Sequence, residues 1–202
     1  GLKKNRKLVP TRWSITATDD TLGKNYLNDI RNFEIIDNYE YYYGYYLGNY
    51  YFIILFPYVF NYELFEAYLP GSSWNPDSQL KVSNDFESFF GRKNYAYITA
   101  GGYYATRLAV LENLFKRRKQ ASALVIRLET PEYWASLGVW VVRASSRRTI
   151  QNQPKLFFDR KSALNKIHKD ILTQFNYDIN SILNRSEVLR ITKTQPLLKQ
   201  FL

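Results

Sequence analysis

A run of aromatic and aliphatic residues between Phe33 and Phe60 constrains the fold more than any other part of the sequence: FEIIDNYEYYYGYYLGNYYFIILFPYVF. Tyr, Phe and Ile favour the pleated surface of a strand, and the tripeptide LGN at positions 47–49 is typical of a tight turn between two strands. Apolar and aromatic side chains fall on both faces of these strands. The run therefore predicts a hairpin inside a sheet that is at least partly covered on both sides.

Two helices and one buried strand are predicted further along the chain. Residues 99–120 contain the clearest helix, because apolar side chains recur there at three- and four-residue spacing, at Leu108, Leu111, Leu114 and Phe115. Residues 121–129 (ASALVIRLE) have the pattern of a buried strand, which Pro131 ends. Residues 159–175 form a second amphipathic helix, with an inner face made of Leu164, Ile167, Ile171 and Phe175.

Other segments have weaker patterns. Residues 7–16 (KLVPTRWSIT) are interpreted as a loop leading into a short strand, and residues 17–25 as a turn or the start of a helix. Residues 62–75 form a short segment that a proline and a glycine interrupt. Residues 137–150 are expected to begin extended and to pass into a helix.

The chain has no internal repeat and no long low-complexity linker, so its 202 residues form one continuous body. We expect an α+β domain over residues 1–192, in which an aromatic-rich, mostly antiparallel sheet packs with several amphipathic helices. Residues 193–202 are expected to be a flexible C-terminal tail.

Composition excludes several kinds of site. The chain has no Cys and a single His, His168, so neither a disulfide nor a zinc site built from Cys or His side chains can form within it. The longest apolar run is short and is interrupted by Pro57, which argues against a membrane span. We expect a soluble, cytoplasmic protein with no membrane partner.

The net charge of +10 is unevenly distributed. Residues 143–202 carry twelve Lys or Arg against four Asp or Glu, whereas residues 21–91 carry three against nine. A basic C-terminal half is the footprint of a partner with phosphates, and a solvated basic surface accounts for it equally well. The residues that we expect to contact a nucleic-acid backbone are Arg107, Arg143, Arg147, Arg148 and Lys155.

Two adjacent carboxylates, Asp19 and Asp20, lie close in sequence to Arg12. Such a pair can hold Mg²⁺ at a phosphodiester, as metal-dependent nucleases require. No further acidic pairing of the D-x-D or E-x-K kind accompanies it, and the same residues can start a helix or form an ion pair with Arg12. The structural explanation is favoured, and these three residues remain the catalytic candidates.

Arg127 and Arg143 both lie inside apolar stretches. A buried guanidinium must be paired, because an unpaired charge in the interior is very costly. Glu112, Glu129 and Glu132 are available partners. A structural ion pair and a clamp for a substrate phosphate explain these arginines equally well.

Two further motifs resemble ligand sites. Eight tyrosines between positions 39 and 51 could stack on single-stranded bases, but they lie in the acidic part of the chain, so packing within the sheet is favoured. Gly101 and Gly102 precede a predicted helix and could bind an anion through free backbone N–H groups. The pair lacks both a Walker Lys and a complete G-x-G-x-x-G pattern, so close packing of the helix on a strand is favoured.

The last eight residues, QPLLKQFL, have the pattern of a docking peptide. One turn of helix starting near Pro196 places four anchor positions on a single side, at Gln195, Leu198, Phe201 and Leu202. The alternative is a C-terminal turn that folds back onto the protein's own core. The string resembles the PIP box, Q-x-x-h-x-x-a-a, through which proteins bind the sliding clamp PCNA; Leu202 replaces its final aromatic residue.

Taken with this peptide, long strings of the sequence resemble the archaeal Nre family of DNA repair proteins. They include KLVPTRWSITATDD, YYLGNYYFIILFP, PGSSWN, GGYYATRLAVLENLFKRRKQA and PEYWASLGVWVVR. The resemblance covers nearly all of the chain and places it in the C-terminal portion of the family. Family members commonly carry a Cys-rich zinc-binding segment near the N-terminus, so the absence of Cys means that no zinc role carries over.

The resemblance implies a DNA repair or DNA damage response factor that residues 193–202 recruit to the sliding clamp, while the basic residues contact DNA in the nucleoid. It brings no established reaction. The first alternative is a metal-dependent nuclease or phosphodiesterase that uses Asp19, Asp20 and Mg²⁺. The second is a scaffold that binds the clamp and another repair protein without binding DNA.

Overall fold

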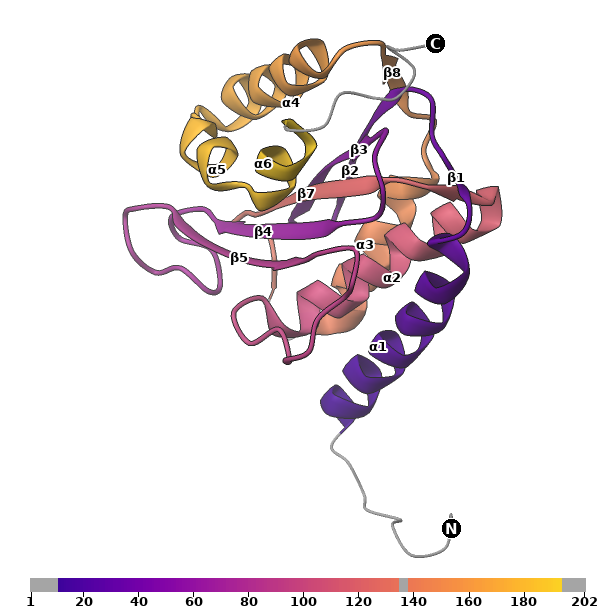
Figure 1. The fold of residues 1–202 in the computed structure, drawn as a ribbon. Helices are drawn as coiled ribbons and strands as arrows, with labels where there is room; N and C mark the ends of the chain where they lie inside the picture. The colour runs from indigo at the N-terminus through magenta and orange to yellow at the C-terminus, as the bar shows by residue number, and fades with distance from the viewer. Residues whose placement is uncertain (1–10, 135–137, 194–202) are drawn as a thin grey trace, which may run out of the picture.

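The computed structural model describes residues 11–134 and 138–193. A six-stranded sheet forms its centre (Figure 1), with the strand order β5–β4–β7–β3–β2–β8. The strands are β2 (Tyr39–Tyr46), β3 (Asn49–Phe56), β4 (Tyr62–Tyr68), β5 (Lys81–Glu87), β7 (Ser122–Glu129) and β8 (Lys155–Phe157). Neighbouring strands are antiparallel except β4 and β7, which are parallel. A short parallel pair, β1 (Glu34–Ile35) with β6 (Lys119–Gln120), lies apart from this sheet. The predicted α+β fold with a mostly antiparallel sheet is confirmed.

Helices cover both faces of the sheet (Figure 1). One hydrophobic core joins the sheet to α1 (Thr11–Ile30), α2 (Ala100–Arg117) and α3 (Val139–Gln151). A second core joins the other face to α4 (Arg160–Phe175), α5 (Asn180–Arg185) and α6 (Glu187–Lys193). The predicted two-sided cover is therefore correct, and the described protein has three layers.

The alternation of side chains along the strands explains these two cores. In β3, Tyr51, Ile53 and Leu55 belong to the first core. Their neighbours Phe52, Ile54 and Phe56 belong to the second core. Successive side chains of a strand point to opposite faces. A central strand that is apolar or aromatic at every position from Tyr50 to Phe56 therefore needs two layers of helices to bury it.

The predicted turn at positions 47–49 joins β2 to β3, whose register pairs Tyr46 with Asn49. Both turn residues have positive φ, 47° at Leu47 and 74° at Gly48, as a two-residue type I′ turn requires. A Cβ at Gly48 would lie 2.3 Å from the backbone nitrogen of Tyr133. The turn therefore packs closely against the loop that follows β7.

Both predicted helices are present. In α2, Leu108, Leu111 and Leu114 are buried, and the helix ends at Arg118, which has a left-handed backbone conformation. The helix α4 begins after Asp159, whose carboxylate accepts a hydrogen bond from the Ser162 backbone N–H at 2.8 Å. This is the contact expected of an N-cap residue.

Two expectations for secondary structure are wrong. From Thr11 onward, the predicted loop and short strand are the first part of the long helix α1. For residues 17–25, expected to be a turn or the start of a helix, the turn is wrong, and the helix that includes them begins earlier, at Thr11. The buried positions of α1 have helical spacing, but the first of them are polar, Thr16 and Asp19, so hydropathy did not reveal the period. Residues 139–150 are helical from their first residue instead of beginning extended. Their buried positions recur with helical spacing, but several of them are polar (Ser145, Ser146 and Thr149), so hydropathy did not reveal this period either.

The tyrosine-rich strand β2 contributes mainly to packing, as favoured above. Tyr41 and Tyr42 are buried, as is Tyr51 on the neighbouring strand. Tyr43 and Tyr45 are partly exposed, and their hydroxyls donate hydrogen bonds to Gln174 and Glu132.

Of the predicted tail, only Lys193 lies within the described residues. Gln195, Leu198, Phe201 and Leu202 lie outside them. Across residues 11–134 and 138–193, no helix combines the length and the apolar character that crossing a bilayer demands.

Replacing Leu47 with Asn should stabilise the protein. Asn tolerates the left-handed conformation better than other residues with a side chain, and Asn-Gly is a preferred type I′ pair. We expect the free energy of unfolding in urea to rise by about 1 kcal/mol or less. Gly48→Ala is the matched opposite case and should destabilise, because its Cβ meets the Tyr133 backbone. A loss of stability in Leu47→Asn would contradict the assigned turn.

Candidate functional site

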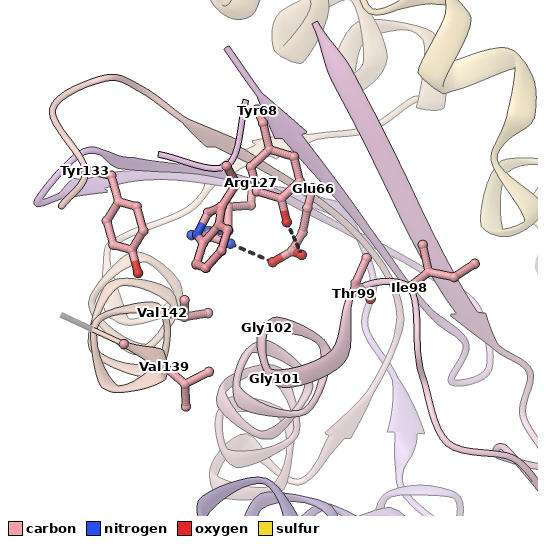
Figure 2. Close-up of a pocket in the computed structure, with 12 residues that line it drawn as sticks. Glu66, Tyr68, Ile98, Thr99, Gly101, Gly102, Arg127, Tyr133, Val139 and Val142 are labelled. Atoms are coloured by element: carbon pink, nitrogen blue, oxygen red, sulfur yellow. Dashed lines mark hydrogen bonds and ion pairs between the residues drawn. The ribbon is translucent and has the colours of Figure 1, made fainter. Parts of the chain in front are cut away.

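A pocket of about 240 Å³ lies at the carboxyl ends of the parallel strands β4 and β7 (Figure 2). The amino ends of α2 and α3 border it, at Thr99 and Gly138. Ligands commonly bind beyond the carboxyl ends of parallel strands, where loops and helix ends meet. The residues that line the pocket include Glu66, Tyr68, Trp74, Ile98, Thr99, Gly101, Gly102, Arg127, Tyr133, Gly138, Val139 and Val142.

A buried ion cluster forms the floor of the pocket. The Arg127 guanidinium donates hydrogen bonds to Glu66 at 2.7 Å and to Glu129 at 2.8 Å. Its Nε donates to the Asn49 side-chain oxygen, also at 2.7 Å. The Tyr68 hydroxyl donates to the second Glu66 oxygen at 2.8 Å (Figure 2). Arg127 thus forms structural ion pairs with Glu66 and Glu129, and the cluster links three adjacent strands, β4, β7 and β3.

The cluster sits directly against the first turn of α2. A Cβ at Gly102 would lie only 2.1 Å from a Glu66 carboxylate oxygen. The glycine pair therefore permits close packing of the helix on the strand, as favoured from the sequence. A carboxylate already occupies the helix end that an anionic ligand would need, which argues against an anion site there.

Two carboxylates facing one guanidinium leave the cluster with an excess of negative charge. Burial raises the pKa of Glu129 to about 7, although the nearby Arg127 guanidinium lowers it. Burial alone would lower the pKa of Arg127, but the carboxylates around it outweigh that effect and raise its pKa. Near neutral pH Glu129 therefore exists in both protonation states and can donate or accept a hydrogen bond.

Aromatic side chains form the walls and the rim of the pocket. Trp74 and Tyr133 line it, and the Arg127 guanidinium lies 5.7 Å from the centre of the Tyr133 ring. Trp74 is 60% exposed. Further exposed aromatic residues are sequence neighbours of lining residues, namely Tyr97, Trp134 and Trp140.

This arrangement suits a small planar ligand with hydrogen-bond donors. Its volume is below the roughly 300–1,000 Å³ of pockets for drug-sized ligands. The acidic floor repels phosphate, whereas the Glu66 carboxylate can accept hydrogen bonds from ring or amino N–H groups, and the aromatic walls can stack on a flat ring. Among residues 11–134 and 138–193, no three His, Cys, Asp or Glu side chains come close enough together to hold a metal ion.

The acidic pair predicted for catalysis lies elsewhere, on α1. Asp19 pairs with Arg143 of α3, and Asp20 pairs with Arg107 of α2 at 2.8 Å. Each carboxylate has its own guanidinium partner, so the two do not form a shared site. Arg12 lies in the first turn of α1, where only the backbone is described.

The basic residues predicted to contact DNA divide into two groups. Arg107 is buried and bound to Glu87 and Asp20, while Arg143 and Arg147 pair with Asp19 and Glu112. The remaining two are exposed. Arg148 lies over the Tyr46 ring, 3.9 Å from its centre, and Lys155 is on the edge strand β8.

Arg148 and Lys155 have no ion-pair partner in the described part of the chain, so their charges remain available to a ligand.

Sequence reasoning missed the pocket itself. It named Arg127 and its partner Glu129, but not Glu66 or Trp74. The segment YELFEAY carried a usable signal, because Glu63 and Glu66 are both flanked by apolar residues there and each would need a partner if buried. No pattern in the sequence shows that β4 and β7 are adjacent, so the pairing of Glu66 with Arg127 was not accessible.

Comparisons with known proteins identify the relatives of this chain. Residues 1–75 match the family model described as archaeal Nre, N-terminal, and residues 87–201 match archaeal Nre, C-terminal. The chain thus matches both models and not only the C-terminal portion that the resemblance implied. No solved structure is significantly similar to it.

Three relatives are named DNA repair proteins. NreA of Haloferax volcanii is 44% identical over 76% of this chain and 37% of its own length. NreB of Archaeoglobus fulgidus is 37% identical over 92% of this chain and 46% of its own length. NreA of the same organism is 40% identical over 81% of this chain and 41% of its own length. The chain spans less than half the length of each relative.

Glu129→Gln should flatten the pH dependence of stability. The folded-state pKa of about 7 lies above the ordinary value of 4.5, so this group contributes stability below pH 4.5 that is lost as the pH rises through 7. Between pH 5 and pH 8 we expect the free energy of unfolding to fall less in Glu129→Gln than in the wild type, as measured in urea. The exposed Glu132→Gln is the control and should follow the wild type. Parallel curves for wild type and Glu129→Gln would contradict the raised pKa.

Proposed function

Because the chain belongs to the archaeal Nre family, we propose that it is a DNA repair factor that binds DNA directly and holds one unstacked base in the pocket between β4, β7, α2 and α3. The names of the relatives support the DNA repair role. The proposal that a base binds here is based on the shape and lining of the pocket. It is small, it has aromatic walls and a buried acidic floor, and Trp74 lies at its rim.

The charge of the pocket determines which part of a nucleotide it accepts. Glu66 lines the pocket and Glu129 is bound to the same Arg127, so their charges disfavour a phosphate. The Glu66 carboxylate can accept hydrogen bonds from the N–H groups of a base. Proteins that act on unpaired bases hold them by such contacts and by aromatic stacking. The phosphates are left to exposed cations, of which Arg148 and Lys155 are free of ion pairs in the described chain.

Recruitment by the sliding clamp is the second part of the proposal. Residues 195–202 match the anchor spacing of a clamp-binding peptide, Q-x-x-h-x-x-a-a. They follow directly after α6, which ends at Lys193. A tether at this point would hold the protein beside the DNA that the clamp encircles and raise its local concentration there.

The nuclease alternative has less support. Asp19 and Asp20 are occupied by Arg143 and Arg107, and these pairs join α1 to α3 and α2. Their arrangement explains both carboxylates as structural. The scaffold alternative predicts no DNA affinity, so the next measurement separates it from the proposal.

Trp74→Ala should weaken binding of single-stranded DNA. Loss of one base-stacking contact costs about 1–3 kcal/mol, which corresponds to roughly 5- to 150-fold in the dissociation constant measured by fluorescence anisotropy. The salt dependence should not change, because no phosphate contact is removed. Trp140→Ala is the matched control, since Trp140 is exposed but does not line the pocket. Equal effects of the two substitutions, or no DNA binding by the wild type, would refute this part of the proposal.

Phe201→Ala/Leu202→Ala should abolish binding to an archaeal sliding clamp, because anchor residues of this kind each contribute about 2 kcal/mol or more. The midpoint of thermal unfolding should stay that of the wild type. Leu197→Ala removes a similar side chain from a non-anchor position and should bind normally. Calorimetry with the purified clamp measures all three, and undiminished affinity in the double variant would exclude the assigned anchors.

A further inference from the structure

A second hollow lies on the opposite side of the sheet, between α4, α5 and α6. Its volume is about 450 Å³, larger than that of the candidate pocket. Its apolar base is formed by Leu164, Leu183 and Leu189, which pack against the second core. None of the residues predicted to contact DNA lines it.

The hollow is strongly basic. Four of its lining residues are cations, contributed by all three helices: Arg160, Arg185, Arg190 and Lys193. Among the described residues that line it, only Glu187 is acidic, and its carboxylate is bound to Arg190 at 2.6 Å. The lining of the hollow therefore keeps an excess of three positive charges, with the amide of Asn184 as a further hydrogen-bond donor. The Asn180 amide, which also lines it, donates to Asp178 at 3.1 Å.

Arg160 lies in this hollow and has no anionic partner among residues 11–134 and 138–193. Its Nη2 donates to the Leu189 carbonyl oxygen at 2.6 Å, while its Nη1 is buried and has no hydrogen-bond partner in the described part of the chain. Burial lowers the pKa of Arg160, whereas most other shifted arginines here have a carboxylate that raises theirs. An uncompensated guanidinium is costly to bury even in part. Because Arg160 lines the hollow, an anion bound there would compensate its charge.

We propose that this hollow binds a phosphate group of the DNA backbone, an inference that rests on the DNA binding proposed above. Arginine N–H groups match phosphate oxygens in geometry and charge, and the exposed rim of the hollow is open to a polymer. Its position favours DNA over a free phosphorylated molecule, because Lys193 on its wall lies two residues before Gln195, the first predicted clamp anchor.

The test removes two rim cations, in Arg185→Ala/Lys193→Ala. The matched control, Lys161→Ala/Lys169→Ala, removes the same charge from exposed positions of α4 outside the hollow. Affinity of the full chain for duplex DNA is measured by anisotropy at several salt concentrations. Loss of two phosphate contacts should reduce the slope of log K against log salt by about 1.8, and the control should keep a slope close to that of the wild type. Equal slopes for both double variants would overturn the proposal.

A second experiment, which does not depend on DNA binding, adds pyrophosphate at constant ionic strength and measures the thermal stability of the protein. Pyrophosphate should raise the midpoint of thermal unfolding of the wild type and of the control, and the rise should be lost in Arg160→Gln and in Arg185→Ala/Lys193→Ala. If pyrophosphate stabilises the protein through these residues but the DNA slope is unchanged, the hollow binds a free phosphorylated molecule and the DNA assignment is wrong. No rise in the wild type would overturn the hollow as a phosphate site, whatever the outcome of the Trp74→Ala experiment.

Discussion

The buried guanidinium of Arg127 is the interaction on which the rest of this structure depends. It bonds to side chains from three adjacent strands, Glu66 of β4, Glu129 of its own strand β7, and Asn49 of β3. Removing one partner of a buried ion pair typically costs about 3–5 kcal/mol, because the other charge is left uncompensated. The same cluster forms the floor of the pocket, so stability and the chemistry of the candidate site share their residues.

The cluster also determines how charge is divided over the molecule. The negatively charged floor of the pocket lies between the amino ends of α2 and α3. Helix amino ends usually favour a phosphate, but here the carboxylates repel it. Positive charge without an ion-pair partner in the described part of the chain lies elsewhere, at Arg148 and Lys155 and around Arg160. In the proposed account a base enters the acidic pocket while phosphates bind these basic sites. DNA that reached both the pocket and the Arg160 hollow would have to pass around an edge of the sheet, because the two lie on opposite faces.

The sequence was informative wherever apolar side chains have a clear period. The aromatic run revealed the β2–β3 hairpin and the two-sided cover of the sheet, and α2 and α4 followed from their leucine and isoleucine spacing. The extent of α1 was missed, although the start of a helix was one expectation for residues 17–25. Its buried face begins with the polar residues Thr16 and Asp19, and an ion pair with Arg143 makes Asp19 tolerable in the interior. From the sequence, a buried Arg127 was expected to have a carboxylate partner, but Glu66 could not be identified as that partner. The contact forms only because β4 pairs in parallel with β7, which brings together two residues that are 61 positions apart in the sequence. Exposure is also a tertiary property, so the sequence could not separate the ion-paired Arg143 and Arg147 from the exposed Arg148.

Photo-crosslinking tests the central claim most directly. A short single-stranded oligonucleotide with one 5-iodouracil base would be bound to the full chain, irradiated and digested, and the attached peptide identified by mass spectrometry. A base held in the pocket should crosslink to Trp74 or Tyr133, and Glu129→Gln should leave the site of attachment unchanged. Crosslinks confined to peptides that contribute nothing to the pocket would show that the base binds elsewhere and would contradict the account.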